Sequence, residues 1–286
     1  MKMAVIGCGL IGGSMALSWK RAGIVDEVIA FGHNPATLQK ALDKGAADTV
    51  TTSMEEAVKD ADIVVSAVPV EAMESVFTEM APFLKSDAVV TDVGSTRQTV
   101  IAVARKGLGD KFHQYAPAHP IAGGEMPGVD YASADLFDEK VVISTPDEGM
   151  DPKVVTFIEE AWRKAGARVQ AMSPLQHDLT FASVSHLPHV LAYALVDMIA
   201  REENAQEKLK MAGAGFRDFT RIASSSPVMW RDICLSNREA LSHELKRYRA
   251  SLDTLQKYID ESDGKALESV FENAVRNRRG LVFPGK

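Results

Sequence analysis

Three glycines near the start of the chain constrain its fold more than any other feature. Gly7, Gly9 and Gly12 follow the apolar run MAVI and come directly before a helical pattern. In this spacing, the first glycine permits a tight turn, the second lets the backbone approach a pyrophosphate, and the third allows close helix packing on a sheet. A purely structural turn is the alternative. The strand and helix on either side favour a dinucleotide site, with contacts at Gly7, Gly9, Leu10, Ile11 and Gly12.

Short apolar runs alternate with helical patterns over residues 1–172. The runs that read as buried strands are MAVIG, EVIAF, DIVVSAV, AVVTDVG, KVVIS and ARVQAM. Asn34-Pro35 marks one helix start, and Ser53 with Glu56 predicts a capping box at another. This rhythm predicts an α/β domain with a doubly wound parallel sheet of the Rossmann type.

Strand signals end near Met172, so residues 173–286 are predicted to form an all-α domain that binds substrate and forms the dimer contact. Residues 238–259 carry one long apolar stripe, made of Leu241, Leu245, Tyr248, Leu252 and Leu255. A stripe this long predicts packing against a second copy of the chain, as a homodimer. Burial within one subunit is the alternative.

Composition excludes several classes of protein. The formal net charge is −7, so no overall basic field would attract nucleic acid or an anionic membrane. We find no apolar window of about 20 residues that would span a bilayer, and we expect the run VLAYALVDMIA to be a buried helix. Cys8 and Cys234 are too few for a disulfide framework. With no leader pattern at the start, a cytoplasmic protein is expected.

The choice between NAD and NADP depends on the end of the second predicted strand. NAD-specific folds usually place an acidic residue there to bind the ribose 2′-hydroxyl. Here the position holds Gly32, followed by His33. Without a carboxylate a 2′-phosphate is not repelled, and His33 could hydrogen-bond it. We therefore expect NAD or NADP as cofactor, with NADP tolerated.

Six motifs occur in an order that resembles the prephenate/arogenate dehydrogenase family, the cyclohexadienyl dehydrogenases of the TyrA type. They are GCGLIGGS, SAVP, TDVGSTR, AHPIAGGE, SHLPH and GFRDFTRIA. The resemblance implies an NAD(P)-dependent oxidative decarboxylation of prephenate or arogenate in tyrosine biosynthesis. Hydride leaves the carbinol carbon of the ring, carbon dioxide departs, and the ring becomes aromatic. The protein must accept a hydroxyl proton and hold two carboxylates.

The resemblance assigns the chemistry to two residues. His119 of AHPIAGGE resembles the catalytic histidine, whose neutral imidazole accepts a hydrogen bond from the hydroxyl. A histidine placed in a turn before proline is the alternative. Ser95 of TDVGSTR resembles the serine that contacts the hydroxyl and the nicotinamide, and a helix N-cap is its alternative. The same motifs imply substrate contacts at Gly124 and Glu125 and cofactor contacts at Val68 and Pro69, and Gly32 and His33 are cofactor candidates from their place at the end of the second predicted strand.

His186 and His189 are three residues apart and are predicted to share a helix face. Zinc binding is disfavoured because no third ligand stands at a suitable spacing, so we predict no metal. The SHLPH motif implies that these histidines line the substrate pocket, and His189 is the better candidate for a contact. His177 and Asp178 resemble another family signature and are predicted to support the site from behind.

Arg221 resembles the family arginine that binds a substrate carboxylate, for which a guanidinium fork is well suited. Arg217 lies four residues earlier on the same predicted helix face, and we interpret it as a surface partner of Asp218. Asp218 is also a candidate substrate contact, because a carboxylate near the side chain of arogenate would favour its amine. Trp230 is predicted to be a wall or core residue.

Two rival functions remain open at this point. A β-hydroxyacid dehydrogenase also joins this fold to a helical domain, but the expected Lys-x-x-x-Asn after the sheet is missing. A non-catalytic NAD(P)-sensing protein would use the helical half to bind a partner. It would not need His119, Ser95 and Arg221 to converge on one cleft.

Overall fold

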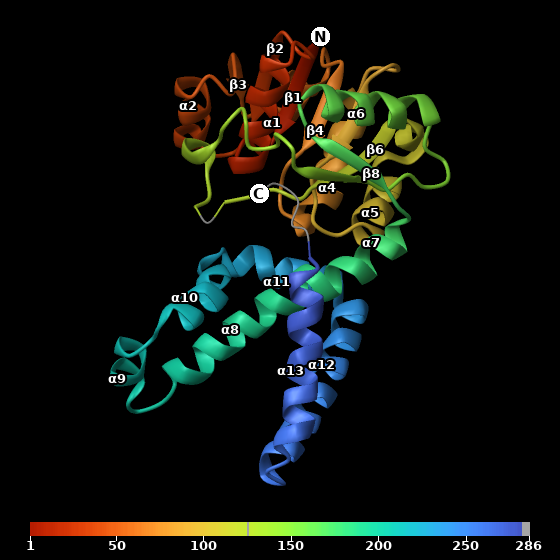
Figure 1. The fold of residues 1–286 in the computed structure, drawn as a ribbon. Helices are drawn as coiled ribbons and strands as arrows, with labels where there is room; N and C mark the ends of the chain where they lie inside the picture. The colour runs from red at the N-terminus through yellow and green to blue at the C-terminus, as the bar shows by residue number, and fades with distance from the viewer. Residues whose placement is uncertain (125, 282–286) are drawn as a thin grey trace.

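The structure is a computed structural model that describes residues 1–124 and 126–281. It shows a sheet domain followed by a helical domain (Figure 1). One eight-stranded sheet has the order β3-β2-β1-β4-β5-β6-β7-β8. The strands are β1 (Lys2–Ile6), β2 (Glu27–Phe31), β3 (Thr49–Thr51), β4 (Ile63–Ser66), β5 (Val89–Asp92), β6 (Tyr115–Pro120), β7 (Val141–Ser144) and β8 (Arg168–Ala171). The predicted Rossmann-like class is confirmed, because β3 through β6 are all parallel.

Helices cover both faces of the sheet and enclose two apolar cores. They are α1 (Leu10–Arg21), α2 (Pro35–Asp43), α3 (Met54–Val58), α4 (Met73–Met80), α5 (Gln98–Leu108) and α6 (Pro152–Lys164), with short turns η1 (Val70–Ala72), η2 (Ala81–Phe83), η3 (Gly109–Gln114) and η4 (Val129–Tyr131). Trp19 of α1 and Trp162 of α6 pack edge to face on one side, 5.6 Å apart. Phe77 of α4 packs on the other side with residues of α3 and α5. The sheet is therefore buried on both faces, as its near-continuous apolar strands require.

Two features of the sheet differ from the prediction. The segment that ends in His119 and Pro120 is strand β6 rather than a proline turn, and His119 pairs with Ile143. Strand β7 runs antiparallel to β6, so the KVVIS segment does not continue the parallel pattern. Neither β6 nor the short β3 was predicted, because their apolar residues are too few or too mixed with polar ones to show a strand period.

Both predicted helix starts are confirmed, but the capping box predicted for the second one does not close. The Asn34 side chain accepts the backbone N–H of Ala36 and caps α2. Ser53 accepts the N–H of Glu56 and caps α3. The Glu56 carboxylate accepts the hydroxyl of Thr51 rather than closing the capping box, and the N–H of Ser53 bonds that hydroxyl oxygen.

The second part of the chain is helical, as expected. Its elements are α7 (Pro174–Phe181), the π-helical turn η5 (Ala182–His186), α8 (Leu187–Ala200), α9 (Ala205–Lys210), α10 (Ala214–Thr220), η6 (Arg221–Ser224), α11 (Pro227–Ser236), α12 (Arg238–Asp260) and α13 (Gly264–Arg279). In Figure 1, α8 with α9 and α10 extends away from the sheet on one side, and α12 with α13 extends on the other. Helix α7 lies at the junction with the sheet domain.

The expectation for α8 was wrong, because only Leu187 and Ala192 of this helix are buried. Among the described residues, one helical stretch, Pro174–Ala200, is long and apolar enough to cross a membrane. Only 22% of its apolar window is buried in the chain. The expectation from the sequence that no apolar segment is long enough to span a bilayer is therefore wrong. The stretch also holds His177 and Asp178, which bond to the sheet domain. Their place in that network favours a helix of the folded domain over a membrane span.

The apolar stripe of α12 is only partly free. Leu241 is buried, Leu245, Tyr248 and Leu255 are half-buried, and Leu252 is exposed. Helix α12 packs against α7, η5 and α13 of its own chain. Part of the stripe is therefore packed inside its own subunit, which is the alternative that the sequence left open.

Candidate active site

The glycine turn fits a dinucleotide pyrophosphate. Gly7 has a φ of +92°, and a Cβ there would lie 2.7 Å from the Ala67 carbonyl oxygen. A Cβ on Gly12 would lie 2.5 Å from the carbonyl oxygen of Gly7. At Gly9, by contrast, a Cβ would meet no atom of residues 1–124 or 126–281 within 4 Å. Gly9 is also the N-cap of α1, and no side chain in the described part of the chain caps this helix start. Open space in front of uncapped N–H groups is the arrangement an anion needs.

Other predicted cofactor residues lie at the carboxyl ends of the neighbouring strands. Gly32 and His33 follow β2, and His33 is exposed with its ring edge-on to Phe31, 5.2 Å away. Val68 and Pro69 follow β4, where Val68 packs against the glycine turn. Ligands of open α/β sheets bind at this edge. Leu10 and Ile11 begin α1 and are half-buried.

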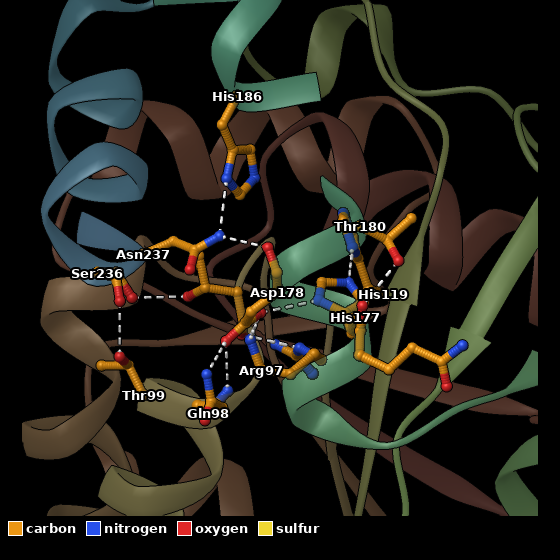
Figure 2. A network of polar contacts seen from close by, with 12 residues as sticks. Arg97, Gln98, Thr99, His119, His177, Asp178, Thr180, His186, Ser236 and Asn237 are labelled. Carbon is orange, nitrogen blue, oxygen red and sulfur yellow. Dashed lines mark hydrogen bonds and ion pairs between the residues drawn. The ribbon is translucent and has the colours of Figure 1, made fainter. Parts of the chain in front are cut away.

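His119 lies near the end of β6 and is only partly buried. Its Nδ1 is 2.7 Å from the Nε2 of His177 (Figure 2). The ring also lies 5.1 Å from that of Phe181, which stacks on His177. Burial, followed by the nearby His177 and Arg97, holds the pKa of His119 well below 6.5. The imidazole is therefore neutral at physiological pH.

His177 and Asp178 are buried in α7, directly behind His119. The Nδ1 of His177 is 2.9 Å from Oδ1 of Asp178. The Asp178 carboxylate also accepts the backbone N–H groups of Arg97 at 2.8 Å and of Gln98 at 2.9 Å (Figure 2). These hydrogen bonds join the first helix of the helical domain to the start of α5.

Ser95 lies in the turn between β5 and α5 and is half-buried. The N-cap of α5 is Arg97, with no capping bond from its own side chain. The alternative role of Ser95 as a helix cap is therefore wrong, because Asp178 supplies that bond from another domain. Asp92 of β5 pairs with Pro117 of β6. Ser95 and His119 consequently leave neighbouring strands at the same edge of the sheet.

An ion pair that sequence reasoning missed lies beneath this turn. Arg97 and Asp92 are completely buried, with Nη2 of the arginine 2.7 Å from Oδ1 of the aspartate. The Tyr115 hydroxyl donates to the same carboxylate, and Nε of Arg97 donates to the Thr96 carbonyl. The only signal in the sequence was the position of Arg97 at the end of TDVGSTR. From the sequence alone, a single arginine at this position is expected to lie on the surface.

His186 and His189 both lie against the aromatic ring of Trp230. Trp230 stacks on His189 at 3.6 Å between ring centres and meets His186 edge-on at 6.1 Å. Asn237, also missed from the sequence, donates to Nδ1 of His186, which is buried. Nδ1 of His189 donates to the Ser185 carbonyl at 2.9 Å. His186 is thus held in the interior, while the half-buried His189 keeps Nε2 for another contact.

Arg221 begins η6 rather than continuing the helix of Arg217, so the two do not share a regular helix face. Arg217 forms an exposed pair with Asp218, 3.3 Å apart, as predicted from the sequence. Arg221 lies close enough to His189 for its charge to lower the pKa of that imidazole, after the larger effect of burial. Of the predicted substrate contacts, Arg221 and His189 are therefore near each other. Asp218 pairs with Arg217 rather than with Arg221.

The AHPIAGGE loop covers the start of α1. A Cβ on Gly124 would lie 3.4 Å from Cδ2 of Leu10. Glu125, predicted to contact substrate, lies outside the described residues. Among residues 1–124 and 126–281, no group of three or more His, Cys, Asp or Glu side chains is placed to hold a metal ion.

Comparison with known proteins agrees with this geometry. Residues 15–171 match the family model "Prephenate dehydrogenase, nucleotide-binding domain", and residues 173–273 match "Prephenate dehydrogenase, dimerization domain". A cyclohexadienyl dehydrogenase of Zymomonas mobilis is 36% identical, covering 98% of this chain and 95% of its own. A crystal structure of Aquifex aeolicus prephenate dehydrogenase with hydroxyphenyl propionate and NAD+ has a TM-score of 0.90 and 34% identity, covering 98% of each chain. Synechocystis arogenate dehydrogenase has a TM-score of 0.82 and 27% identity, covering 99% of this chain and all of its own (100%). The chain belongs to the prephenate dehydrogenase family.

Proposed function

We propose that this protein oxidatively decarboxylates prephenate, arogenate or both, with NAD or NADP as hydride acceptor, as a step of tyrosine biosynthesis. The observation that carries the proposal is the position of His119, a neutral imidazole at the sheet edge where the glycine turn also lies. A bound nicotinamide would accept the hydride there. Family membership and the names of the relatives support the reaction class.

His119 is proposed to accept the hydrogen bond of the substrate hydroxyl. As hydride leaves the carbinol carbon, positive charge develops on the hydroxyl group, and a neutral imidazole stabilises it by accepting the proton. The bond from the ring to its carboxylate then breaks, its electron pair enters the ring, and carbon dioxide departs. Ser95 is proposed to orient the same hydroxyl from the neighbouring strand end.

Arg221 and His189 are proposed to bind the side-chain end of the substrate. Arg221 is a permanent cation and suits a carboxylate. His189 presents Nε2 beside the wall formed by Trp230. Trp230 is buried, and its indole Nε1 has no hydrogen-bond partner among the residues that the structure describes. Gly124, Glu125, Asp218 and His186 remain proposed contacts of the pocket. His186 is the weakest of them, because it is buried against Asn237.

We also propose that two copies assemble through α13. Leu267, Phe271 and Val275 line a concave surface of about 920 Å³ on this helix. Glu268 and Glu272 lie toward one end of it and Arg276 and Arg279 toward the other. Antiparallel packing of two such helices would place acidic side chains opposite basic ones. The free cysteines Cys8 and Cys234 fit a reducing location, which we propose to be the cytoplasm.

A steady-state matrix tests the function: two substrates against two cofactors, followed at the absorbance of the reduced nicotinamide. We expect turnover with at least one pair and the release of one carbon dioxide per hydride. Reduction without carbon dioxide release, or no reduction with any pair, would refute the proposal. Analytical ultracentrifugation of Phe271→Asp beside the unaltered protein tests the α13 contact.

A further inference from the structure

Asp178 determines where the protons lie in the row of side chains behind His119. Its carboxylate accepts hydrogen bonds from four donors: the backbone N–H groups of Arg97 and Gln98, the Nδ1 of His177 and, at 3.4 Å, the side-chain amide Nε2 of Gln98. The pKa of Asp178 is below 3.8, since the bonds from His177 and the two backbone groups outweigh the opposing effect of burial. An ionised carboxylate can only accept hydrogen bonds. The Nδ1 of His177 must therefore carry its proton.

The protonation of His177 determines the protonation of the His119 ring. Burial keeps His177 neutral, because it lowers the pKa of the imidazole despite the neighbouring Asp178. With its proton on Nδ1, a neutral His177 has only a lone pair on Nε2. That atom lies 2.7 Å from Nδ1 of His119. Since Nε2 of His177 can only accept, Nδ1 of His119 must donate.

We infer that His177 is a positioning residue that holds His119 in the tautomer with a proton on Nδ1 and a lone pair on Nε2. The inference rests on the proposed function for its chemical consequence. A free imidazole in water prefers the opposite tautomer, in which Nε2 carries the proton and cannot accept a hydroxyl proton. The chain Asp178, His177, His119 reverses that preference before any substrate binds.

The same carboxylate also controls the turn that carries Ser95. By accepting the N–H groups of Arg97 and Gln98, Asp178 caps α5 two residues after Ser95. One side chain in α7 therefore fixes both the tautomer of His119 and the position of the serine turn. Figure 2 shows that the bonds to the Asp178 carboxylate come from His177, in its own helix, and from Arg97 and Gln98 of the sheet domain.

Two substitutions at position 177 separate the positioning role from simple packing. In His177→Asn, the side-chain amide can replace Nδ1 and keep the donor to Asp178, but nothing reaches His119. In His177→Gln, the amide oxygen can replace Nε2 and accept from His119, but the bond to Asp178 is lost. His113→Asn, at an exposed histidine of η3, is the control.

If His177 positions His119, kcat of His177→Asn falls by about ten- to a hundredfold with little change in cofactor KM. His177→Gln then keeps more activity than His177→Asn, although it is the less stable of the two. If the histidine is only structural, the order of activity follows stability, and His177→Asn is the more active. That result would overturn the inference.

A second measurement needs no turnover. In protein labelled with ¹⁵N in its histidine rings, long-range proton–nitrogen correlations distinguish protonated from unprotonated ring nitrogens. We expect Nδ1 of His119 to be protonated and Nε2 to be unprotonated, with the signals assigned by their loss in His119→Asn. A proton on Nε2 would refute the inference even if the enzyme turns over prephenate. An inactive enzyme with the expected tautomer would refute the proposed function alone.

Discussion

The carboxylate of Asp178 accepts the backbone N–H of Arg97, which is 81 residues earlier in the chain and in the other domain. This bond closes the start of α5 in place of a local capping residue. Further bonds cross the same boundary: Thr99 donates to the Ser236 carbonyl, and the hydroxyl oxygens of Thr96 and Ser236 lie 2.7 Å apart. The helical domain is thus part of the structure that holds the serine turn in place.

Asp178→Asn is expected to destabilise the protein by about 2 to 3 kcal/mol, because a buried carboxylate that accepts hydrogen bonds from Arg97, Gln98 and His177 loses its charge. Chemical denaturation with a probe of each domain would measure this. Asp197→Asn, which removes an exposed pair with Arg201, should change the free energy of unfolding by less than about 0.5 kcal/mol. Equal effects of the two substitutions would contradict the role of Asp178 at the domain boundary.

His119→Asn should retain the fold and dinucleotide binding while turnover falls by roughly 10²–10⁴-fold. The reason is that the asparagine cannot accept a proton at the position of Nε2. Binding of NAD+ by calorimetry and the melting temperature serve as controls. Near-normal turnover would remove His119 from the proton-accepting role.

The pH dependence of turnover should reflect the low pKa of His119. Burial, together with the nearby His177, Arg97 and His186, holds this pKa well below 6.5. The neutral form therefore persists below the pH at which a free histidine titrates, and kcat should stay at its neutral-pH level until the pH falls well under 6.5. Loss of kcat between pH 8 and pH 6.5 would contradict this placement of His119.

The free energy of unfolding should also decrease as the pH falls. The pKa of His186 is about 4 in the folded chain and 6.5 in a free histidine, chiefly because burial disfavours the charged form. The unfolded state therefore binds more protons between these values, and stability is lost as the pH falls through them. At pH 5 this one group costs about 2 kcal/mol relative to neutral pH. His186→Phe should flatten the fall in melting temperature between pH 7 and pH 5.

Arg221→Ala is expected to raise the KM for substrate by about tenfold or more with a smaller change in kcat, because a charge-assisted contact to a carboxylate is removed. Arg217→Ala is the matched control, since Arg217 pairs with Asp218 on the surface. Its KM should stay within about twofold of the unaltered enzyme. If both substitutions act alike, Arg221 has no special role at the substrate.

The sequence predicted the parts of the site that depend on local spacing. The glycine turn is an example, since Gly7, Gly9 and Gly12 are neighbours in the chain; Gly7 and Gly12 have a steric reason to be glycine, and Gly9 leaves the space that an approaching pyrophosphate needs. His119 and Ser95 were reached only through a resemblance to a family. Their own neighbourhoods suggested a turn and a helix cap, and the structure shows a strand and a turn capped from elsewhere.

What could not be predicted depends on long-range contacts. Arg97 and Asp92 are five residues apart, yet nothing local indicates that both are completely buried. Asn237 bonds His186 and the Asp178 carbonyl, which are 51 and 59 residues away in the sequence. Likewise, the composition of α8 suggests a buried helix, whereas the fold leaves most of its residues only half-buried within the chain. Burial is a property of the assembled domains, and periodicity within one segment does not report it.

Gly32→Asp should shift cofactor preference toward NAD. Gly32 follows β2, where a carboxylate would accept a hydrogen bond from a ribose 2′-hydroxyl and repel a 2′-phosphate. The backbone can accept the change, because a Cβ there would make only ordinary contact with Leu38, at 3.4 Å. One charge-assisted hydrogen bond corresponds to about 2 kcal/mol, so the ratio of kcat/KM for NAD over NADP should rise by about thirtyfold. His33→Ala is the companion variant, because it removes the one side chain proposed to bind a 2′-phosphate and should lower kcat/KM for NADP alone. An unchanged ratio in Gly32→Asp would mean that the ribose lies elsewhere along the sheet edge.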